Sequence, residues 1–424
     1  MTIQELHRHF LKHPQISTDT RKIESNAIFF CLKGENFDGN TFAKNALAKG
    51  ASLVIADDPS YAKDDKIVLV EDVLSCLQEL ASFHRNYCKA KVIALTGSNG
   101  KTTTKELIYA VLSKKYNTIA TKGNLNNHIG VPLTLLSIQQ DTEIAIIEMG
   151  ANHLKEIEFL AAIAQPDFGY ITNFGKAHLE GFGGEAGVIK GKSELYEYLM
   201  SHNKHIFLNA DDPIQSKKLA EYIKKFGYSQ DDPKYYNIKL EAADPFVSLA
   251  VEDITITTKL IGTYNFTNCC AAVLIGKYFN VEKIDIKEAL EEYVPTNNRS
   301  QLLVKSGHKI ILDAYNANPS SMQVALENFN QMKASYKIVF LGDMFELGGV
   351  AEEEHQKIAD LADNMNFNQA FLIGENFNNT KTTLKKFRTF NDLSQYLEKQ
   401  QLPPADLLIK GSRGMALERI LDIL

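Results

Sequence analysis

The sequence predicts an α/β protein of three domains: a small N-terminal α/β domain, a central domain with a mostly parallel sheet and helices on both faces, and a C-terminal Rossmann-like domain. The chain has 424 residues, which is too long for one ordinary core. Short apolar runs alternate with segments of helical periodicity. A glycine-rich loop lies between one such strand and helix. We expect domains at 1–88, 89–298 and 299–424.

Composition excludes several classes of protein. A formal net charge of −6 gives no general attraction for nucleic acid or an anionic membrane. No apolar run approaches the ~18 residues of a membrane span, and the N-terminus lacks a secretory apolar segment. The five cysteines have no CxxC spacing, which favours free thiols in a reducing compartment. We therefore expect a cytoplasmic protein, and a monomer.

The first domain combines short strands with two helices. We expect strands at 27–32, 53–56 and 67–70 and helices at 41–49 and 73–87. Polar loops at 17–21 and 33–40 carry a lone arginine and a lone lysine. These loops could be solvated turns or could contact a ligand, and residue chemistry leaves both open.

The central domain begins with a loop that should hold phosphate. Residues 92–95 form a buried strand, and apolar residues at 107, 108, 111 and 112 recur at helical spacing. Gly97 and Gly100 let backbone N–H groups face a phosphate, while the helix N-terminus and Lys101 add positive charge. Thr102 places a hydroxyl where magnesium would lie. The loop is shorter than GxxxxGK[ST], but all its parts occur in the required order. The expected nucleotide contacts here are Thr96, Gly97, Ser98, Asn99, Gly100, Lys101, Thr102 and Thr103.

Polar residues follow the next strands of this domain. The strand at 144–147 ends in Glu148, and an acid at the carboxyl end of an inner strand suits magnesium. The strand at 168–172 leads to His178, for which a structural role and a metal role are equally open. In the loop 123–132, Asn126 and Asn127 could cap turns or line a polar cleft.

The rest of the chain continues the alternation. A helix at 188–199 carries Lys190 and Lys192, which composition alone places on an exposed face. Residues 234–260 alternate as antiparallel strands at the edge of the sheet, and residues 295–299 form a linker. Strands at 310–312, 338–341, 370–373 and 407–409 form a second parallel sheet, whose loops could close as a lid over the central domain.

These residues describe an enzyme that uses ATP and a metal ion, although a phosphate-loop nucleotide switch or regulatory binding protein has the same parts. The guanine-specifying NKxD pattern is absent, which disfavours a GTPase. The motifs TGSNGKTTTKE, GNLNNHIGVPLTLL, EMGANHLKEI, ITNFGKAHLEGFGG, DAYNANPSSM, GDMFELG and IKGSRGM are more informative, because together they resemble those of the Mur ligases. The resemblance covers all three expected domains in order.

The resemblance implies a ligase that joins D-Ala-D-Ala to UDP-N-acetylmuramoyl tripeptide, with ATP cleaved to ADP and phosphate through an acyl phosphate. The product would be the pentapeptide precursor of bacterial peptidoglycan. A sibling ligase, or one of folylpolyglutamate type, that adds a single amino acid remains the alternative within this class.

The resemblance also implies roles for individual residues. Lys101, Glu148, His178 and Lys192 would be catalytic. Thr102 and Glu148 would hold one Mg²⁺, Glu148 and His178 a second, and Lys192 would support the second as a carbamate. Asn265 and Asn268 would flank the adenine, with Arg299, Asp313 and Tyr315 at the ribose and phosphates. Ser17, Asp19, Arg21, Lys33, Asp38 and Asn40 would bind UDP, and Asn126, Asn127 and Arg413 the peptide or dipeptide.

Overall fold

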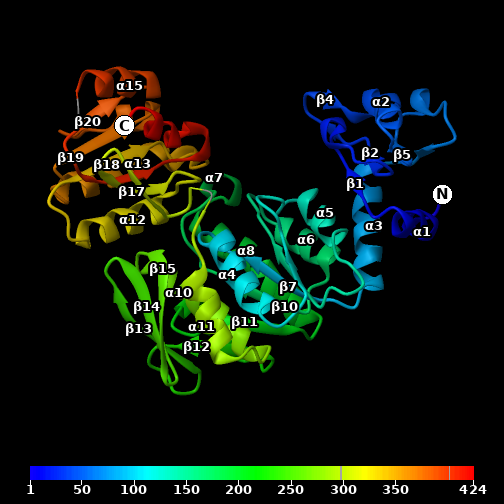
Figure 1. Ribbon diagram of the computed structural model, residues 1–424, viewed down its shortest axis with the longest axis horizontal. Coiled ribbons are helices and arrows are strands. Elements are labelled where there is room, and N and C mark those ends of the chain that lie inside the picture. The colour runs from blue at the N-terminus through cyan, green and yellow to red at the C-terminus, as the bar shows by residue number, and fades with distance from the viewer. Residues whose placement is uncertain (297, 401) are drawn as a thin grey trace.

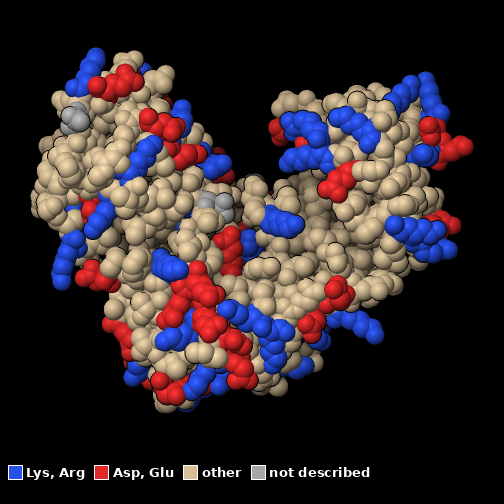
Figure 2. Space-filling view, in the orientation of Figure 1, with Lys and Arg blue, Asp and Glu red and all other residues tan. Residues whose placement is uncertain are grey.

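The computed structural model describes residues 1–296, 298–400 and 402–424 and builds the chain around three main sheets. The N-terminal and C-terminal sheets form two arms above the central sheet (Figure 1). The molecular surface is hollowed between the arms (Figure 2). One position of the expected linker, residue 297, lies outside the described residues. Within the described ranges, no helix has the length and apolar character needed to cross a membrane.

The N-terminal sheet is parallel, with the strand order β1-β2-β5-β6. Its strands are β1 (Ile16–Ser17), β2 (Ile28–Phe30), β5 (Leu53–Ala56) and β6 (Ile67–Leu69); β3 (Lys33–Gly34) and β4 (Phe37–Asp38) form a separate hairpin; the helices are α1 (Ile3–Lys12), α2 (Ala43–Ala48) and α3 (Val73–Tyr87). We did not expect α1. It begins with a capping box between Thr2 and Glu5 and buries Leu6 and Phe10.

Helix α3 is anchored to the central domain through Arg85. The Arg85 guanidinium lies 2.8 Å from the carboxylate of Asp167 and donates hydrogen bonds to the carbonyls of Ala164 and Gln165. Asp167 in turn accepts a hydrogen bond from the backbone N–H of Val92, in the first strand of the central sheet. The buried Arg85 guanidinium is therefore paired by groups of the central domain. This ion pair and its hydrogen bonds hold the N-terminal arm to the central sheet in addition to the covalent connection.

The central sheet has nine strands in the order β15-β14-β13-β12-β11-β10-β7-β9-β8. The strands are β7 (Lys91–Thr96), β8 (Thr118–Ala120), β9 (Ile144–Glu148), β10 (Phe168–Ile171), β11 (His205–Asn209), β12 (Lys225–Ser229), β13 (Tyr236–Ala243), β14 (Phe246–Val251) and β15 (Ile254–Ile261). All neighbours are parallel except for the β13–β14 and β14–β15 pairs. The predicted antiparallel edge is therefore confirmed.

Helices cover both faces of this sheet, as predicted. They are α4 (Lys101–Ser113), α5 (Gly130–Leu135), α6 (Glu156–Ala164), α7 (Leu179–Phe182), α8 (Glu185–Ser201), α9 (Pro213–Lys218), α10 (Tyr264–Tyr278) and α11 (Lys283–Glu292). Alternate residues of β7 belong to different cores: Ile93 packs with residues of α4, α10 and α11, and Val92 with residues of α5, α6 and α8. This alternation follows from the period of two along a strand.

The C-terminal sheet has the order β16-β17-β21-β18-β19-β20, and only the β16–β17 pair in it is antiparallel. Its elements are β16 (Gln301–Lys305), β17 (His308–Asp313), β18 (Lys337–Gly342), β19 (Gln369–Ile373), β20 (Lys385–Phe387), β21 (Asp406–Lys410), α12 (Pro319–Gln331), α13 (Ala351–Asn364), α14 (Glu375–Asn378) and α15 (Phe390–Lys399). Short 3₁₀ turns lie at Thr20–Lys22, Gly39–Phe42, Pro59–Tyr61, Gly348–Val350, Arg413–Met415 and Leu417–Asp422.

Candidate active site between the central and C-terminal domains

A cavity of about 1290 Å³ lies where the central and C-terminal domains meet. The loops that follow β7, β9 and β10 line it from the central domain, and the loop that follows β17, with Lys410 at the end of β21, lines it from the C-terminal domain. All of these loops leave the carboxyl ends of parallel strands, which is where ligands bind in open α/β sheets.

The loop between β7 and α4 requires glycine at two positions. Gly97 has φ 141° and Gly100 has φ 78°. A Cβ on Gly97 would lie 2.0 Å from Oγ1 of Thr172, and one on Gly100 would lie 2.6 Å from Oδ1 of Asn268. The loop therefore has little room for anything except its own backbone. Gly100 is the N-cap of α4 and caps it without a side chain, so the first N–H groups of that helix can face a bound anion.

Lys101 folds back over this loop. Its Nζ donates to the carbonyl oxygens of Gly97, at 2.8 Å, and Ser98, at 3.2 Å. Burial lowers the pKa of Lys101 from its ordinary value, and the Glu148 carboxylate opposes that effect. A phosphate bound in the loop could replace these two carbonyl oxygens as the hydrogen-bond acceptor of the Lys101 ammonium. A hydrogen bond between two charged groups is stronger than one to a neutral carbonyl.

Glu148 is buried with one carboxylate oxygen unsatisfied. Its Oε1 accepts hydrogen bonds from Nδ2 of Asn126, at 2.8 Å, and Oγ1 of Thr102, at 3.3 Å. Its Oε2 has no hydrogen-bond partner, and the Lys105 ammonium lies 3.7 Å away. A buried carboxylate oxygen that accepts no hydrogen bond is costly even with an ammonium group nearby, and a hard cation satisfies it well. The hydroxyl and carboxylate therefore fit one magnesium ion.

The other two residues predicted to hold metal have protein partners. His178 contacts the carboxylate of Glu346 from the C-terminal domain through Nδ1. Lys192 donates from Nζ to the carbonyl of Ala151 at 3.0 Å. Among the described residues, no three His, Cys, Asp or Glu side chains converge as a metal site. Any ion beside Glu148 would thus depend on a threonine hydroxyl and on oxygens of a bound ligand.

Lys192 corrects one expectation from composition. It lies in α8 and is 0% exposed, whereas Lys190 is exposed as predicted. Its Nζ lies 4.9 Å from the centre of the Phe182 ring. Burial, with a smaller contribution from Lys101, lowers the pKa of Lys192 well below its ordinary value. The neutral amine that this favours is the form that reacts with carbon dioxide.

The two asparagines expected near the adenine lie behind the phosphate loop. Asn268 accepts a hydrogen bond from Oγ1 of Thr104 at 3.0 Å and donates to Oδ1 of Asn265 at 2.9 Å. Asn265 donates to the carbonyl of Ile261 at 2.8 Å. Both residues are buried and line the cavity, so this pair connects the start of α10 to the loop.

On the opposite wall, Tyr315 lies beside two arginines. The guanidinium carbon of Arg299 is 3.6 Å from the centre of the Tyr315 ring, and that of Arg413 is 5.5 Å away. Nε of Arg299 is buried without a hydrogen-bond partner. Asp313 pairs with Lys410 at 2.5 Å, and the backbone N–H of Ser300 donates to it. We did not predict Lys410, because it is distant in sequence from Asp313.

Direct hydrogen bonds join the C-terminal domain to two loops of the central domain, the phosphate loop and the loop that follows β10. Asn318, which caps α12, donates from Nδ2 to Oδ1 of Asn99 at 2.8 Å. Ser320 accepts a hydrogen bond from the backbone N–H of Lys176 at 2.8 Å. Both domains therefore contribute to the cavity. Movement of the C-terminal domain would disturb the loops of the central domain to which it is hydrogen-bonded.

The six residues predicted in the N-terminal domain form two clusters. Ser17, Asp19 and Arg21 make the first, in which Arg21 forms a fork with the Asp19 carboxylate, the closest contact being 2.7 Å. Lys33, Asp38 and Asn40 make the second around Asp57 and the Asn40 amide: Asp57 is 2.8 Å from Nζ of Lys33 and from Nδ2 of Asn40, which also donates to Asp38. We did not predict a role for Asp57, because it follows β5 and is distant in sequence from both predicted loops.

One candidate for substrate contact has a structural task. Oδ1 of Asn127 accepts hydrogen bonds from the backbone N–H groups of Ile129 and Gly130, at the start of α5. The sequence left two roles open for this loop, capping a turn and lining a polar cleft. Asn127 caps the start of α5 and also lines the cavity. Asn126 instead reaches Glu148.

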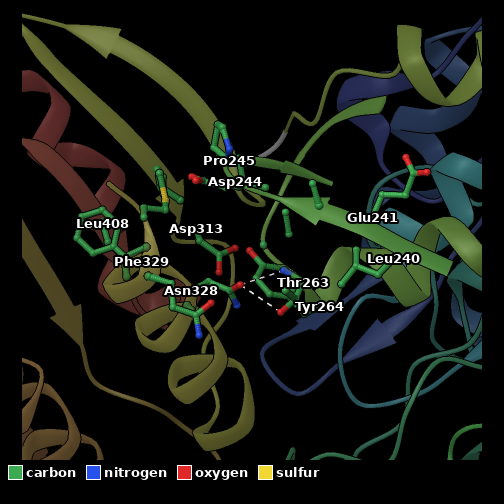
Figure 3. A pocket seen from close by; sticks show the side chains of 18 residues that line it. Leu240, Glu241, Asp244, Pro245, Thr263, Tyr264, Asp313, Asn328, Phe329 and Leu408 are labelled. Atoms are coloured by element: carbon green, nitrogen blue, oxygen red, sulfur yellow. Dashed lines mark hydrogen bonds between the residues drawn. The ribbon is translucent and has the colours of Figure 1, made fainter. Parts of the chain in front are cut away.

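A second, smaller cavity of about 370 Å³ lies between the β13–β14 hairpin and α12 (Figure 3). Asn328 spans it by accepting hydrogen bonds from the backbone N–H and Oγ1 of Thr263. Asp313 and Tyr264 line both cavities, so this one lies behind the larger site at the junction of the two domains.

The fold and the larger cavity define a three-domain α/β protein with a phosphate loop at a domain interface. Family models for the Mur ligases match the chain in order: the "Mur ligase family, catalytic domain" at residues 14–85, the "Mur ligase middle domain" at 95–276 and the "Mur ligase, glutamate ligase domain" at 298–413. The chain belongs to the Mur ligase family.

Individual relatives align with nearly the whole of this chain. The UDP-N-acetylmuramoyl-tripeptide–D-alanyl-D-alanine ligase of Bacillus subtilis is 35% identical over 96% of this chain and 92% of its own, and that of Escherichia coli is 31% identical over 96% and 93%. A crystal structure of MurF from Acinetobacter baumannii matches with a TM-score of 0.85 at 31% identity, covering 96% of this chain and 92% of that one. MurF from Thermotoga maritima in complex with ADP also gives 0.85, at 26% identity and 96% of each chain. The predicted fold class is confirmed.

Proposed function

We propose that this ligase joins D-Ala-D-Ala to UDP-N-acetylmuramoyl tripeptide, with ATP cleaved to ADP and phosphate. The acceptor and donor are those named for relatives that align over more than nine-tenths of the chain. The observation that carries the proposal is the shared cavity, in which the phosphate loop and Glu148 of one domain face Arg299, Asp313 and Tyr315 of the other.

The chemistry needs activation because a carboxylate is a poor electrophile. A carboxylate oxygen of the tripeptide attacks the γ-phosphorus of ATP, the bond to the β–γ bridging oxygen breaks, and ADP leaves. The amine of D-Ala-D-Ala then attacks the acyl carbon, phosphate leaves, and the amine proton is lost to the medium. Holding the three reactants beside one another converts reactions between separate molecules into reactions between bound neighbours.

Each wall of the cavity has a task in this proposal. The phosphate loop and Lys101 hold the triphosphate and neutralise charge on the transferring group. Asn265 and Asn268 flank the adenine, and Arg299, Asp313 and Tyr315 contact the ribose and phosphates. A magnesium ion held by Thr102 and Glu148 would neutralise phosphate charge. A second, held by Glu148 and His178 and supported by a carbamate on Lys192, would do the same on the acceptor side.

The N-terminal arm would bind the uridine diphosphate. Its two clusters combine an exposed arginine and a half-exposed lysine with polar side chains, which suits a diphosphate and a ribose. Asn126 and Arg413 are assigned to the peptide and the dipeptide, with Asn127 contributing through the loop it caps. The domain ranges 1–88, 89–298 and 299–424, a monomeric state and a cytoplasmic location complete the proposal.

The test is phosphate release from Mg-ATP and UDP-N-acetylmuramoyl tripeptide with a panel of acceptors added singly. We expect release that depends on D-Ala-D-Ala and not on D-Ala, L-Ala, D-Glu or L-Lys, with a pentapeptide product of the matching mass. Release driven by a single amino acid would assign the chain to a sibling ligase. Slow hydrolysis indifferent to every acceptor would instead indicate a nucleotide switch.

A further inference from the structure

Lys105 is a buried cation next to the proposed magnesium site. It lies in α4, one turn after Thr102, and only 3% of its side chain is exposed. Its Nζ lies 3.7 Å from Oε2 of Glu148, whose side chain is 2% exposed. Thr102 and Glu148 line the large cavity and Lys105 does not. The ammonium group therefore approaches the carboxylate from the protein interior.

The two oxygens of the Glu148 carboxylate have different neighbours. Oε1 accepts hydrogen bonds from Asn126 and Thr102. Oε2 accepts no hydrogen bond and has the Lys105 ammonium as its ion-pair partner. In the part of the chain that the structure describes, no other cationic side chain forms an ion pair with Glu148. Lys105 is therefore the countercharge of this buried carboxylate.

A countercharge in this place changes what the site attracts. A cation bound to Oε2 at about 2.1 Å would lie within about 5.8 Å of Nζ of Lys105, whatever its direction. At such distances, repulsion by the ammonium group opposes attraction by the carboxylate. Lys101, at the start of the same helix, adds positive charge to the loop. Before nucleotide binds, these three side chains together favour an anion over a divalent cation. The phosphates of a bound nucleotide would reverse that balance.

We propose that Lys105 is a positioning residue that holds the Glu148 carboxylate and balances its charge, so that a divalent cation binds tightly beside Glu148 only together with nucleotide phosphates. The inference rests on the proposed nucleotide and magnesium sites. Because binding equilibria are linked, nucleotide raises the affinity for the cation by the same factor as the cation raises the affinity for nucleotide. Lys105 sets the size of that factor by weakening cation binding when nucleotide is absent.

The test measures two affinities. Binding of Mn²⁺, a paramagnetic substitute for Mg²⁺, to the nucleotide-free protein is followed by electron paramagnetic resonance. Binding of Mg-AMP-PNP, which carries a non-hydrolysable ATP analogue, is followed by isothermal titration calorimetry. Lys105→Gln removes the charge and keeps a hydrogen-bond donor for Oε2. We expect its affinity for Mn²⁺ to rise roughly tenfold or more, while its affinity for Mg-AMP-PNP stays equal or falls.

Two further variants serve as controls. Lys105→Arg keeps the charge and should bind Mn²⁺ as weakly as the unaltered protein. Lys204→Gln removes a lysine charge from a partly buried pair with Asp167, which precedes β10 at the end of the sheet away from the cavity. It should change neither affinity.

Lys105→Met tests the same point if glutamine perturbs folding, which thermal unfolding would reveal. Unchanged or weaker Mn²⁺ binding in both neutral variants would overturn the inference, because loss of a merely structural contact does not raise affinity. An equal gain for Mn²⁺ and Mg-AMP-PNP, or a gain in Lys105→Arg as large as in Lys105→Gln, would also overturn it. Micromolar binding of Mn²⁺ to the unaltered protein without nucleotide would contradict it independently of any variant. Failure of the unaltered protein to bind Mg-AMP-PNP would instead contradict the proposed function.

Discussion

Thr102 and Glu148 meet on the floor of the cavity, where Oγ1 of Thr102 lies 3.3 Å from Oε1 of Glu148 while Oε2 of the same carboxylate has no hydrogen-bond partner. The threonine is the second residue of the helix that follows the phosphate loop, and the glutamate ends the neighbouring strand β9. A cation at this point would lie beside the phosphates held by the loop. The geometry thus connects nucleotide binding to charge neutralisation through two adjacent elements.

Lys101→Ala should reduce turnover at least about a hundredfold, because it removes the cation nearest the transferring phosphoryl group. Binding of UDP-N-acetylmuramoyl tripeptide, measured by calorimetry, should stay within about twofold, since the N-terminal arm is separate. Lys114→Ala is the control: Lys114 follows α4 and pairs with Glu288 and Glu292 at the surface. Loss of tripeptide binding together with turnover would contradict the assignment of domains.

Lys192→Ala should be inactive and partly rescued by acetate or formate, because a short carboxylate can replace the anion that a carbamate would supply. Lys190→Ala, which alters an exposed neighbour in the same helix, should retain activity. In the unaltered protein, ¹³C NMR with labelled bicarbonate should reveal one carbamate signal that disappears in Lys192→Ala. A spectrum without that signal would remove the support for carbamylation.

Arg21→Ala should raise KM for the UDP substrate by roughly tenfold, because a charge-assisted contact to phosphate is lost. KM for ATP should change little. The side chain is 85% exposed and pairs only with Asp19 in the described structure, so stability should not fall. Lys22→Ala removes the neighbouring exposed charge as a control. A change confined to the ATP KM would place the uridine site elsewhere.

Acidification should destabilise the contact between α1 and α3. Nε2 of His7 lies 3.0 Å from Nδ1 of His84, whose Nε2 bonds to the carbonyl of Ile138. Burial, with His84 adding to it, lowers the pKa of His7 to about 4. Between pH ~6.5 and ~4 the imidazole of His7 is therefore protonated in the unfolded chain but not in the folded protein. The free energy of unfolding should decrease as the pH is lowered through this range.

The cost should reach up to about 3 kcal/mol near pH 4 for His7 alone. Thermal and urea unfolding at pH 7, 5.5 and 4.5 would measure it. His7→Gln should flatten the dependence, whereas His202→Gln, at an exposed position, should leave it intact. Identical pH profiles for the protein and His7→Gln would show that His7 does not titrate in this way.

The sequence predicted the elements whose signals are local. The exact span of α3 and the ends of β5 follow from apolar periodicity bounded by polar residues, and the phosphate loop follows from glycines between a strand and a helix. Helix α1 was missed because its buried side reduces to Leu6, His7 and Phe10 among charged residues. Strand β12 was missed because a glycine interrupts its apolar residues.

The partners of the site residues could not be predicted in the same way. Asp57, Lys105, Lys410 and Glu346 each meet a site residue that lies elsewhere in the chain, and no spacing in the sequence encodes those contacts. Burial was equally hidden: Lys190 and Lys192 look alike in sequence, and only the packing of α8 against Phe182 and Ala151 separates them. The roles of the site residues were inferred from the family resemblance, whereas the residues that contact them became known only from the structure.

The most direct measurement uses UDP-N-acetylmuramoyl tripeptide labelled with ¹⁸O in the carboxylate that accepts the dipeptide. If that carboxylate attacks ATP and D-Ala-D-Ala then displaces phosphate, the released phosphate carries one ¹⁸O and the pentapeptide retains the other, in amounts equal to the ADP formed. Unlabelled phosphate would contradict the account, because it would mean that water, and not the tripeptide, attacks the nucleotide.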